Sequence, residues 1–69
     1  MSDTNAFAHR LKTVRKAADL SIYALSKKAE VDRAYLGKLE KGVGDPSWSV
    51  VQKLAAALGC STEELRAQP

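Results

Sequence analysis

Few side chains in this 69-residue chain could take part in covalent or metal chemistry. It contains one histidine, His9, and one cysteine, Cys60, which are too few for a cysteine–histidine zinc site or an internal disulfide. No Ser–His–Asp, Cys–His or paired-carboxylate arrangement that would support catalysis can be recognised. The sequence therefore predicts a protein that is not an enzyme and that holds no metal or cofactor.

The chemistry that remains is electrostatic, and it is concentrated in one part of the chain. Residues 1–42 carry nine Lys or Arg against five Asp or Glu, a net charge of +4, whereas residues 43–69 carry two against three, a net charge of −1. A basic N-terminal part indicates a surface that faces a polyanion. A solvated surface of mixed charge would give the same count, so charge alone leaves both interpretations open.

The most informative basic stretch is 20–42, LSIYALSKKAEVDRAYLGKLEKG. Ser21 and Asp32 are typical helix N-caps, and Gly42 is a typical residue just beyond a helix C-terminus. The stretch therefore predicts two short helices joined by a three-residue turn. The second of them, 33–41, presents a small and basic face outward, which is how a protein presents a helix to the major groove of DNA.

Further helices are predicted on both sides of this pair, and no segment has the pattern of a strand. Apolar residues at helical spacing run from Phe7 to Ala18. Ser47 is the N-cap expected before the most apolar helix, and Ser61 forms a capping box with Glu64 at the start of a short last helix. The fold class is therefore all-α with five helices.

Length and composition indicate one small domain. The chain is 45% hydrophobic and 28% charged, which is typical of a folded domain. We expect its core to span about residues 6–66, with flexible ends at 1–4 and 67–69. No apolar run approaches the about 18 residues of a membrane span, and the N-terminus lacks a signal-peptide core. A cytoplasmic location, with no membrane partner, is the expectation.

These elements resemble, in order and spacing, the Cro/cI-type (XRE) helix-turn-helix family of phage repressors and bacterial regulators. The similarity runs from about Phe7 to Leu65 and is carried by FAHRLKTVRKAADLS, YALSKKAEVDRAYLGKLEKG and DPSWSVVQKLAAALGCSTEEL. The resemblance implies a compact, lambda-repressor-like fold of five helices whose second and third helices form the helix-turn-helix. It also implies that helix 33–41 is the recognition helix in the major groove of double-stranded DNA.

The family pattern implies base contacts on the outward side of helix 33–41. An arginine side chain can bond bidentately to guanine, and a small apolar side chain can contact a thymine methyl group. A glycine there permits close approach to DNA, although neutral drift at an exposed position would leave the same residue. The expected base contacts are Arg33, Ala34, Gly37 and Lys38.

The same pattern implies phosphate contacts at both ends of the motif, from Ser21, Ile22, Tyr35, Lys41, Val43 and Gly44. For Tyr35, packing along the preceding helix is an alternative. Ile22 stands where the family usually has a glutamine that grips a phosphate and braces the recognition helix, so only its N–H and the Ser21 hydroxyl remain for that role. Asp19 and Glu30 stand where the family usually has glycine.

An ion pair between Arg15 and Glu40 is also implied by the resemblance. The residue spacing supports it, because Arg15 follows Val14 and Glu40 follows Leu39, at the edge of two predicted apolar stripes. Such a pair would have a structural role, tying the first helix to the third. Two separately solvated charges are the alternative.

Two functions follow as hypotheses. The first is a sequence-specific DNA-binding transcriptional regulator of bacterial, phage or plasmid type, acting as a homodimer on a two-fold operator. The second is an antitoxin-like module of the same fold that binds a protein partner. Ile22, the weakly basic loop after residue 42 and Trp48 favour the second hypothesis.

Overall fold

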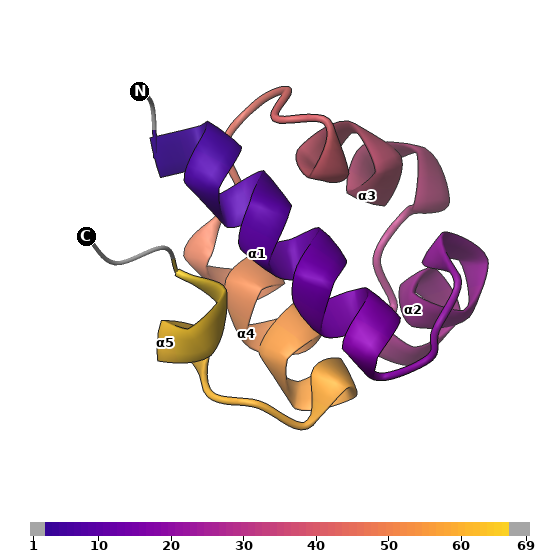
Figure 1. Ribbon diagram of the computed structural model, residues 1–69. Helices are drawn as coiled ribbons and strands as arrows, with labels where there is room; N and C mark the ends of the chain where they lie inside the picture. Colours follow the sequence, from indigo (N-terminus) through magenta and orange to yellow (C-terminus); the bar gives the residue numbers. More distant parts are fainter. Residues whose placement is uncertain (1–2, 67–69) are drawn as a thin grey trace.

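Residues 3–66 of the computed structural model form an all-α fold without a strand (Figure 1). The helices are α1 Asp3–Ala17, α2 Ile22–Ala29, α3 Arg33–Glu40, α4 Trp48–Leu58 and α5 Thr62–Leu65. The expected fold class is thereby confirmed. Helix α1 begins at Asp3, within the end that the sequence predicts to be flexible, and residues 1–2 and 67–69 lie outside the described part of the chain.

Side-chain caps start the four helices that follow α1. Each cap oxygen accepts a hydrogen bond from the backbone N–H three residues later, at 3.0 to 3.3 Å, and thereby satisfies one of the free amides of the first turn. The caps are Ser21, Asp32, Ser47 and Ser61. Glu64 completes the capping box by accepting from the Ser61 N–H at 2.9 Å.

The core is built mainly from leucines that every helix supplies. Burying one leucine side chain contributes roughly 1.5–3 kcal/mol relative to leaving it in water. The fully buried set is Leu11, Leu25, Leu36, Leu39, Leu54 and Leu65. Helix α1 crosses the molecule diagonally, with α4 and α5 on one side and α2 and α3 on the other (Figure 1). Helix α3 packs on α1 and α2, so its inner face is held from two directions.

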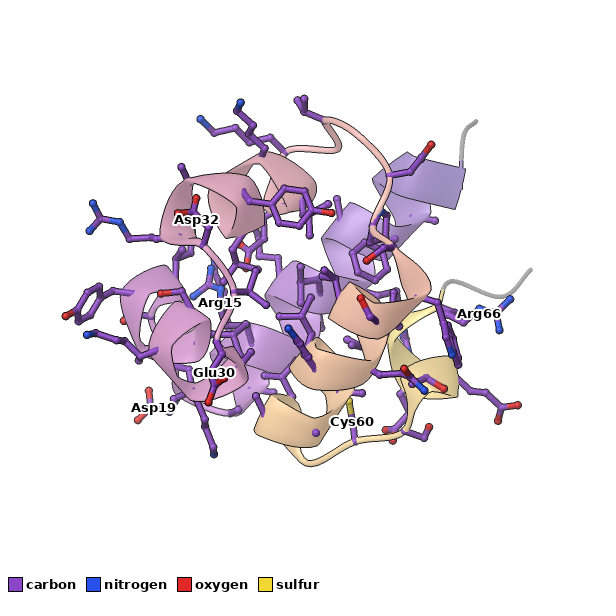
Figure 2. All side chains as sticks on the ribbon, turned by 180° about the vertical axis from the view of Figure 1, so that it is seen from behind. Arg15, Asp19, Glu30, Asp32, Cys60 and Arg66 are labelled. Atoms are coloured by element: carbon purple, nitrogen blue, oxygen red, sulfur yellow. The ribbon has the colours of Figure 1, made fainter. Side chains whose placement is uncertain are left out.

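Two turns hold a non-glycine residue in the left-handed backbone region. Asp19, after α1, has φ 63°, and Glu30, the C-cap of α2, has φ 58°. The Val31 N–H donates to the Ser26 carbonyl at 3.0 Å and closes the turn between α2 and α3. The side chains of Asp19 and Glu30, labelled in Figure 2, are both exposed. Both turns thus have the left-handed residue for which the family usually uses glycine, and a residue with a Cβ atom there causes some backbone strain.

Candidate nucleic-acid interface

Helix α3 has one buried face and one exposed face. The buried face carries Leu36, Leu39 and Glu40. The exposed side chains include Arg33, Ala34 and Lys38. Because Asp32 caps the helix and its inner face is locked into the core, α3 presents these small and basic groups on a rigid element.

Gly37 lies on the same helix and is partly exposed. A Cβ atom built at this position would meet nothing within 4 Å. No neighbouring atom of the described chain therefore requires a glycine here, although glycine costs about 0.5–1 kcal/mol of helix stability relative to alanine. The reason for this glycine must be sought outside the domain or in neutral drift.

A buried ion pair ties α3 to α1. Arg15 Nε donates to Glu40 Oε2 at 2.5 Å, and its Nη2 donates to Glu40 Oε1 at 2.9 Å, while Nη1 donates to the Leu20 carbonyl at 2.7 Å. Only 10% of the Arg15 side chain and 3% of the Glu40 side chain are exposed. The hydrogen bonds to Glu40 raise the pKa of the Arg15 guanidinium, against the opposing effect of burial. Arg15 lies in the interior, as Figure 2 shows.

The N-terminus of α2 offers backbone donors. The Ser21 hydroxyl accepts from the Ala24 N–H at 3.0 Å, which leaves its own proton to donate. The N–H groups of the first turn have no carbonyl one turn earlier to bind, so they suit an anion. The Ile22 side chain is partly buried and packs against the core. It therefore belongs to the core and provides no side-chain contact for a phosphate.

At the other end of α3, the Val43 amide is already engaged. Its N–H donates to the Lys38 carbonyl at 2.9 Å, closing the helix end. In the free domain this N–H therefore has an internal partner, and its expected contact with a phosphate stays a prediction. Lys41 and Gly44 remain exposed beside it, and the positive φ of 76° at Gly44 shapes the loop.

Tyr35 lies partly within the fold, and its expected phosphate contact stays a prediction. Its side chain is partly buried and packs against the core. Its hydroxyl donates to the Asp45 carbonyl at 3.5 Å, a long bond that links α3 to the following loop. The hydroxyl thus has a weak protein partner in the free domain.

Two exposed aromatic residues carry cationic neighbours that sequence reasoning missed. Tyr23 in α2 is 54% exposed, with the Lys27 Nζ 5.4 Å and the Arg33 guanidinium carbon 5.9 Å from its ring centroid. Trp48 is 53% exposed, and the Arg66 guanidinium carbon lies 5.8 Å from its ring. The Tyr23–Lys27 contact could have been predicted from sequence, because residues four apart are neighbours on a helix surface. The Arg33 contact could not, because it depends on the angle between α2 and α3.

Metal-binding and nucleophilic chemistry depends on the position and environment of the described side chains. Between residues 6 and 66, whose side chains the structure describes, no group of three or more His, Cys, Asp or Glu side chains could hold a metal ion. Burial, aided by the nearby Glu64 charge, raises the pKa of the Cys60 thiol, which disfavours the nucleophilic thiolate. None of the helices in this part of the chain has both the length and the apolar character to cross a membrane.

Two short helices joined by a tight turn, with an exposed basic face on the second, are the arrangement of the helix-turn-helix class of DNA-binding proteins. The family HTH_3, described as helix-turn-helix, matches residues 11–65. The chain belongs to this family of XRE-type, repressor-like transcription regulators.

Individual relatives are regulators as well. The restriction-modification controller protein C.AhdI from Aeromonas hydrophila is 35% identical, with a TM-score of 0.90 over 94% of this chain and 98% of that one. An HTH_3 family transcriptional regulator from Vibrio cholerae is 30% identical, with a TM-score of 0.88 over 91% of this chain and 35% of that one. An immunity repressor of Bacillus phage phi105 is 38% identical over 50 residues, which are 72% of this chain and 35% of the repressor. The chain thus spans about a third of the length of the last two proteins.

Proposed function

We propose that this protein regulates transcription by binding a specific DNA sequence, with α3 in the major groove, as a homodimer on a two-fold operator. The observation that carries the proposal is the division of α3 into a locked inner face and an outer face of small and basic groups. A chain of this kind would act in the cytoplasm, at the nucleoid of a bacterium or on phage or plasmid DNA. Double-stranded DNA is then its principal partner.

Base recognition would come from the first turns of α3. Arg33, the first helical residue, has the forked guanidinium that suits guanine O6 and N7. Ala34 offers a methyl group for a thymine methyl, and Lys38 lies one turn further for a guanine or a phosphate. Gly37 removes the side chain that would hold the helix away from the base edges.

Phosphate contacts would position α3 from both sides. On one side the Ser21 hydroxyl and the Ile22 N–H meet the backbone at the start of α2. On the other side Lys41 and the Gly44 N–H take the next phosphate. Tyr35 supports this loop through its bond to the Asp45 carbonyl.

The length of α3 supports a dimer. Its 8 residues span about 12 Å, the length of only three to four base pairs, which is too short to define an operator alone. Two copies related by a two-fold axis double the sequence that is read, with half-sites about 34 Å apart. C.AhdI, a restriction-modification controller protein, is a relative whose solved chain is matched over 98% of its length.

Selection from random duplexes, followed by fluorescence anisotropy across a salt series, tests the proposal. We expect one selected sequence to bind more tightly than scrambled duplexes at every salt concentration. Arg33→Ala/Lys38→Ala should lose this preference, whereas Lys12→Ala/Lys53→Ala, which removes two exposed charges outside α2 and α3, should keep it. Equal affinity of the wild type for all duplexes would rule out the proposal.

A protein-binding module of the same fold is the second candidate. Trp48 at 53% exposure and Val43 at 54% leave large apolar groups on the surface, and the Ile22 side chain offers no phosphate grip. Such an antitoxin-like module would retain its partner in Arg33→Ala/Lys38→Ala and lose it in Trp48→Ala. Co-purification of both variants with a stoichiometric partner protein distinguishes this function from the first.

A further inference from the structure

Tyr23, the residue that follows Ile22, has an exposed ring with two cationic neighbours. Tyr23 is a large aromatic residue, more than half exposed, on the face of α2 that borders the start of α3. Two cationic side chains lie over its ring, Lys27 from its own helix and Arg33 from the next. Its backbone carbonyl accepts from the Ser26 hydroxyl at 2.7 Å, which anchors the residue in its helix.

The two positive groups at one ring have a clear physical origin. The face of an aromatic ring is negative and attracts a cation within about 6 Å, and a planar guanidinium packs on it better than an ammonium does. The ring therefore restricts Arg33, a long side chain that would otherwise sample many rotamers in water. Binding DNA with a restricted side chain loses less conformational entropy.

Two neighbouring side chains at this edge have other roles. The Ile22 side chain turns into the core, and the Asp32 carboxylate accepts from the Tyr35 N–H as the cap of α3. Within the described residues, the side-chain contact that joins the exposed edge of α2 to Arg33 is the Tyr23 ring.

We propose that Tyr23 is a positioning residue for Arg33, holding its guanidinium at the N-terminus of the recognition helix for base readout. The inference rests on the function proposed above and adds to it a specificity-determining residue outside α3. Lys27 shares the ring, so its ammonium adds positive charge beside Arg33 and favours an anionic ligand at this corner of the domain. The occupant of this corner is the DNA half-site that Arg33 reads.

A double-mutant cycle tests the role of the ring. Affinities are measured for the wild type, Tyr23→Phe, Tyr23→Leu, Arg33→Ala and Tyr23→Leu/Arg33→Ala. The probes are the selected duplex and a duplex changed at the base pair where Arg33→Ala loses discrimination. Failure of the wild type to prefer the selected duplex would show separately that the proposed function is wrong, before any Tyr23 variant is compared.

A positioning role of the ring gives one pattern of results. Tyr23→Leu should bind the selected duplex about two- to fivefold more weakly, the equivalent of one exposed cation–π contact, and the changed duplex almost unchanged. Tyr23→Phe, which keeps the ring, should match the wild type. In the Arg33→Ala background, Tyr23→Leu should have no further effect.

Three outcomes would overturn the inference. An equal loss on both duplexes, or in the Arg33→Ala background, would show a general role unrelated to Arg33. A loss in Tyr23→Phe equal to that in Tyr23→Leu would assign the effect to the hydroxyl. Tighter binding by Tyr23→Leu would mean that the ring withdraws Arg33 from DNA.

A measurement on the free protein does not depend on DNA. The Arg33 side-chain protons should show a ring-current shift in the wild type and in Tyr23→Phe, and the shift should disappear in Tyr23→Leu. Arg33 proton shifts that are identical in all three proteins would contradict the contact itself. Thermal unfolding confirms that the variants are folded, which we expect because Tyr23 is exposed and leucine suits a helix.

Discussion

Arg15 and Glu40 lie 25 residues apart in sequence, and their contact decides how α1 meets α3. All of the buried side-chain nitrogen and oxygen atoms described between residues 6 and 66 have hydrogen-bond partners, and this pair is part of that set. Because the pKa of Arg15 is raised, deprotonation of its guanidinium does not remove the contribution of the pair to stability near neutral pH. That deprotonation occurs in strong alkali, above the ordinary range of an arginine.

Removing one charge of the pair should destabilise the domain strongly. Glu40→Gln leaves the Arg15 guanidinium buried without a counter-charge, so we expect the free energy of unfolding to fall by about 3 kcal/mol. In a domain of this size that corresponds to a decrease in Tm of about 12 °C or more. Urea and thermal unfolding followed by circular dichroism measure both quantities.

Lys16→Gln is the matched control for this prediction. Lys16 neighbours Arg15 in sequence but is exposed, and a surface charge of this kind changes stability by at most about 0.5 kcal/mol. An unchanged Tm in Glu40→Gln would mean that the pair does not hold the helices together.

At the scale of the elements, the turn between α2 and α3 keeps a left-handed residue without using glycine. Glu30 has φ 58°, a conformation that disfavours residues with a Cβ, and Asp19 repeats the situation after α1. Aspartate tolerates this region better than glutamate does. The greater strain therefore lies within the helix-turn-helix itself.

Glycine at the strained turn should stabilise the domain. We expect Glu30→Gly to raise the free energy of unfolding by about 1 kcal/mol, and Asp19→Gly to raise it by less. Urea unfolding provides the measurement. Glu30→Gln, which removes the charge and keeps the Cβ, should leave stability unchanged, and an equal gain in this variant would assign the effect to charge instead of backbone conformation.

Within α3, a substitution at Gly37 should affect stability and DNA binding in opposite directions. Open space surrounds the position that a Cβ atom would take, so Gly37→Ala should stabilise the helix by about 0.5–1 kcal/mol. If α3 approaches the base edges closely, the added methyl group should weaken binding to the selected duplex by at least about fivefold. Thermal unfolding and anisotropy on one sample test both parts, and unaltered affinity would show that Gly37 is not a site of close approach.

At the scale of the whole molecule, positive charge is asymmetric and modest. The net charge is +3, and the basic residues near the proposed interface are few, with Lys38 and Lys41 exposed on α3 and just after it. Counterion release scales with the number of phosphates that are neutralised. Affinity per domain should therefore be moderate and should fall as salt is raised.

Lys41 offers a direct test of this electrostatic contribution. Lys41→Gln should weaken binding to selected and scrambled duplexes alike, and the slope of log affinity against log salt should become shallower by about one. Lys53→Gln, which removes another exposed lysine, on α4, should alter neither quantity. A change in sequence preference in Lys41→Gln would instead place this lysine against a base.

Local features of the sequence were sufficient to predict most of the architecture. The caps Ser21, Asp32, Ser47 and Ser61 act within one turn of chain, and the apolar spacing follows the period of a single helix. The left-handed residues after α1 and α2 were also foreseeable from the family pattern. Such features need no knowledge of neighbouring helices, which is why they can be read from sequence.

Contacts between helices were harder to predict from the sequence. The engaged amide of Val43 and the bond from the Tyr35 hydroxyl to the Asp45 carbonyl depend on how the chain closes after α3. The convergence of Lys27 and Arg33 on the Tyr23 ring depends on the angle between α2 and α3, and so on the leucines that pack beneath them. Capping hydrogen bonds within one turn, and the spacing of apolar residues along a helix, therefore specify which helices form and where they end. Only packing between helices decides which side chains of different helices meet, because the spacing and angle between their axes are properties of the assembled core.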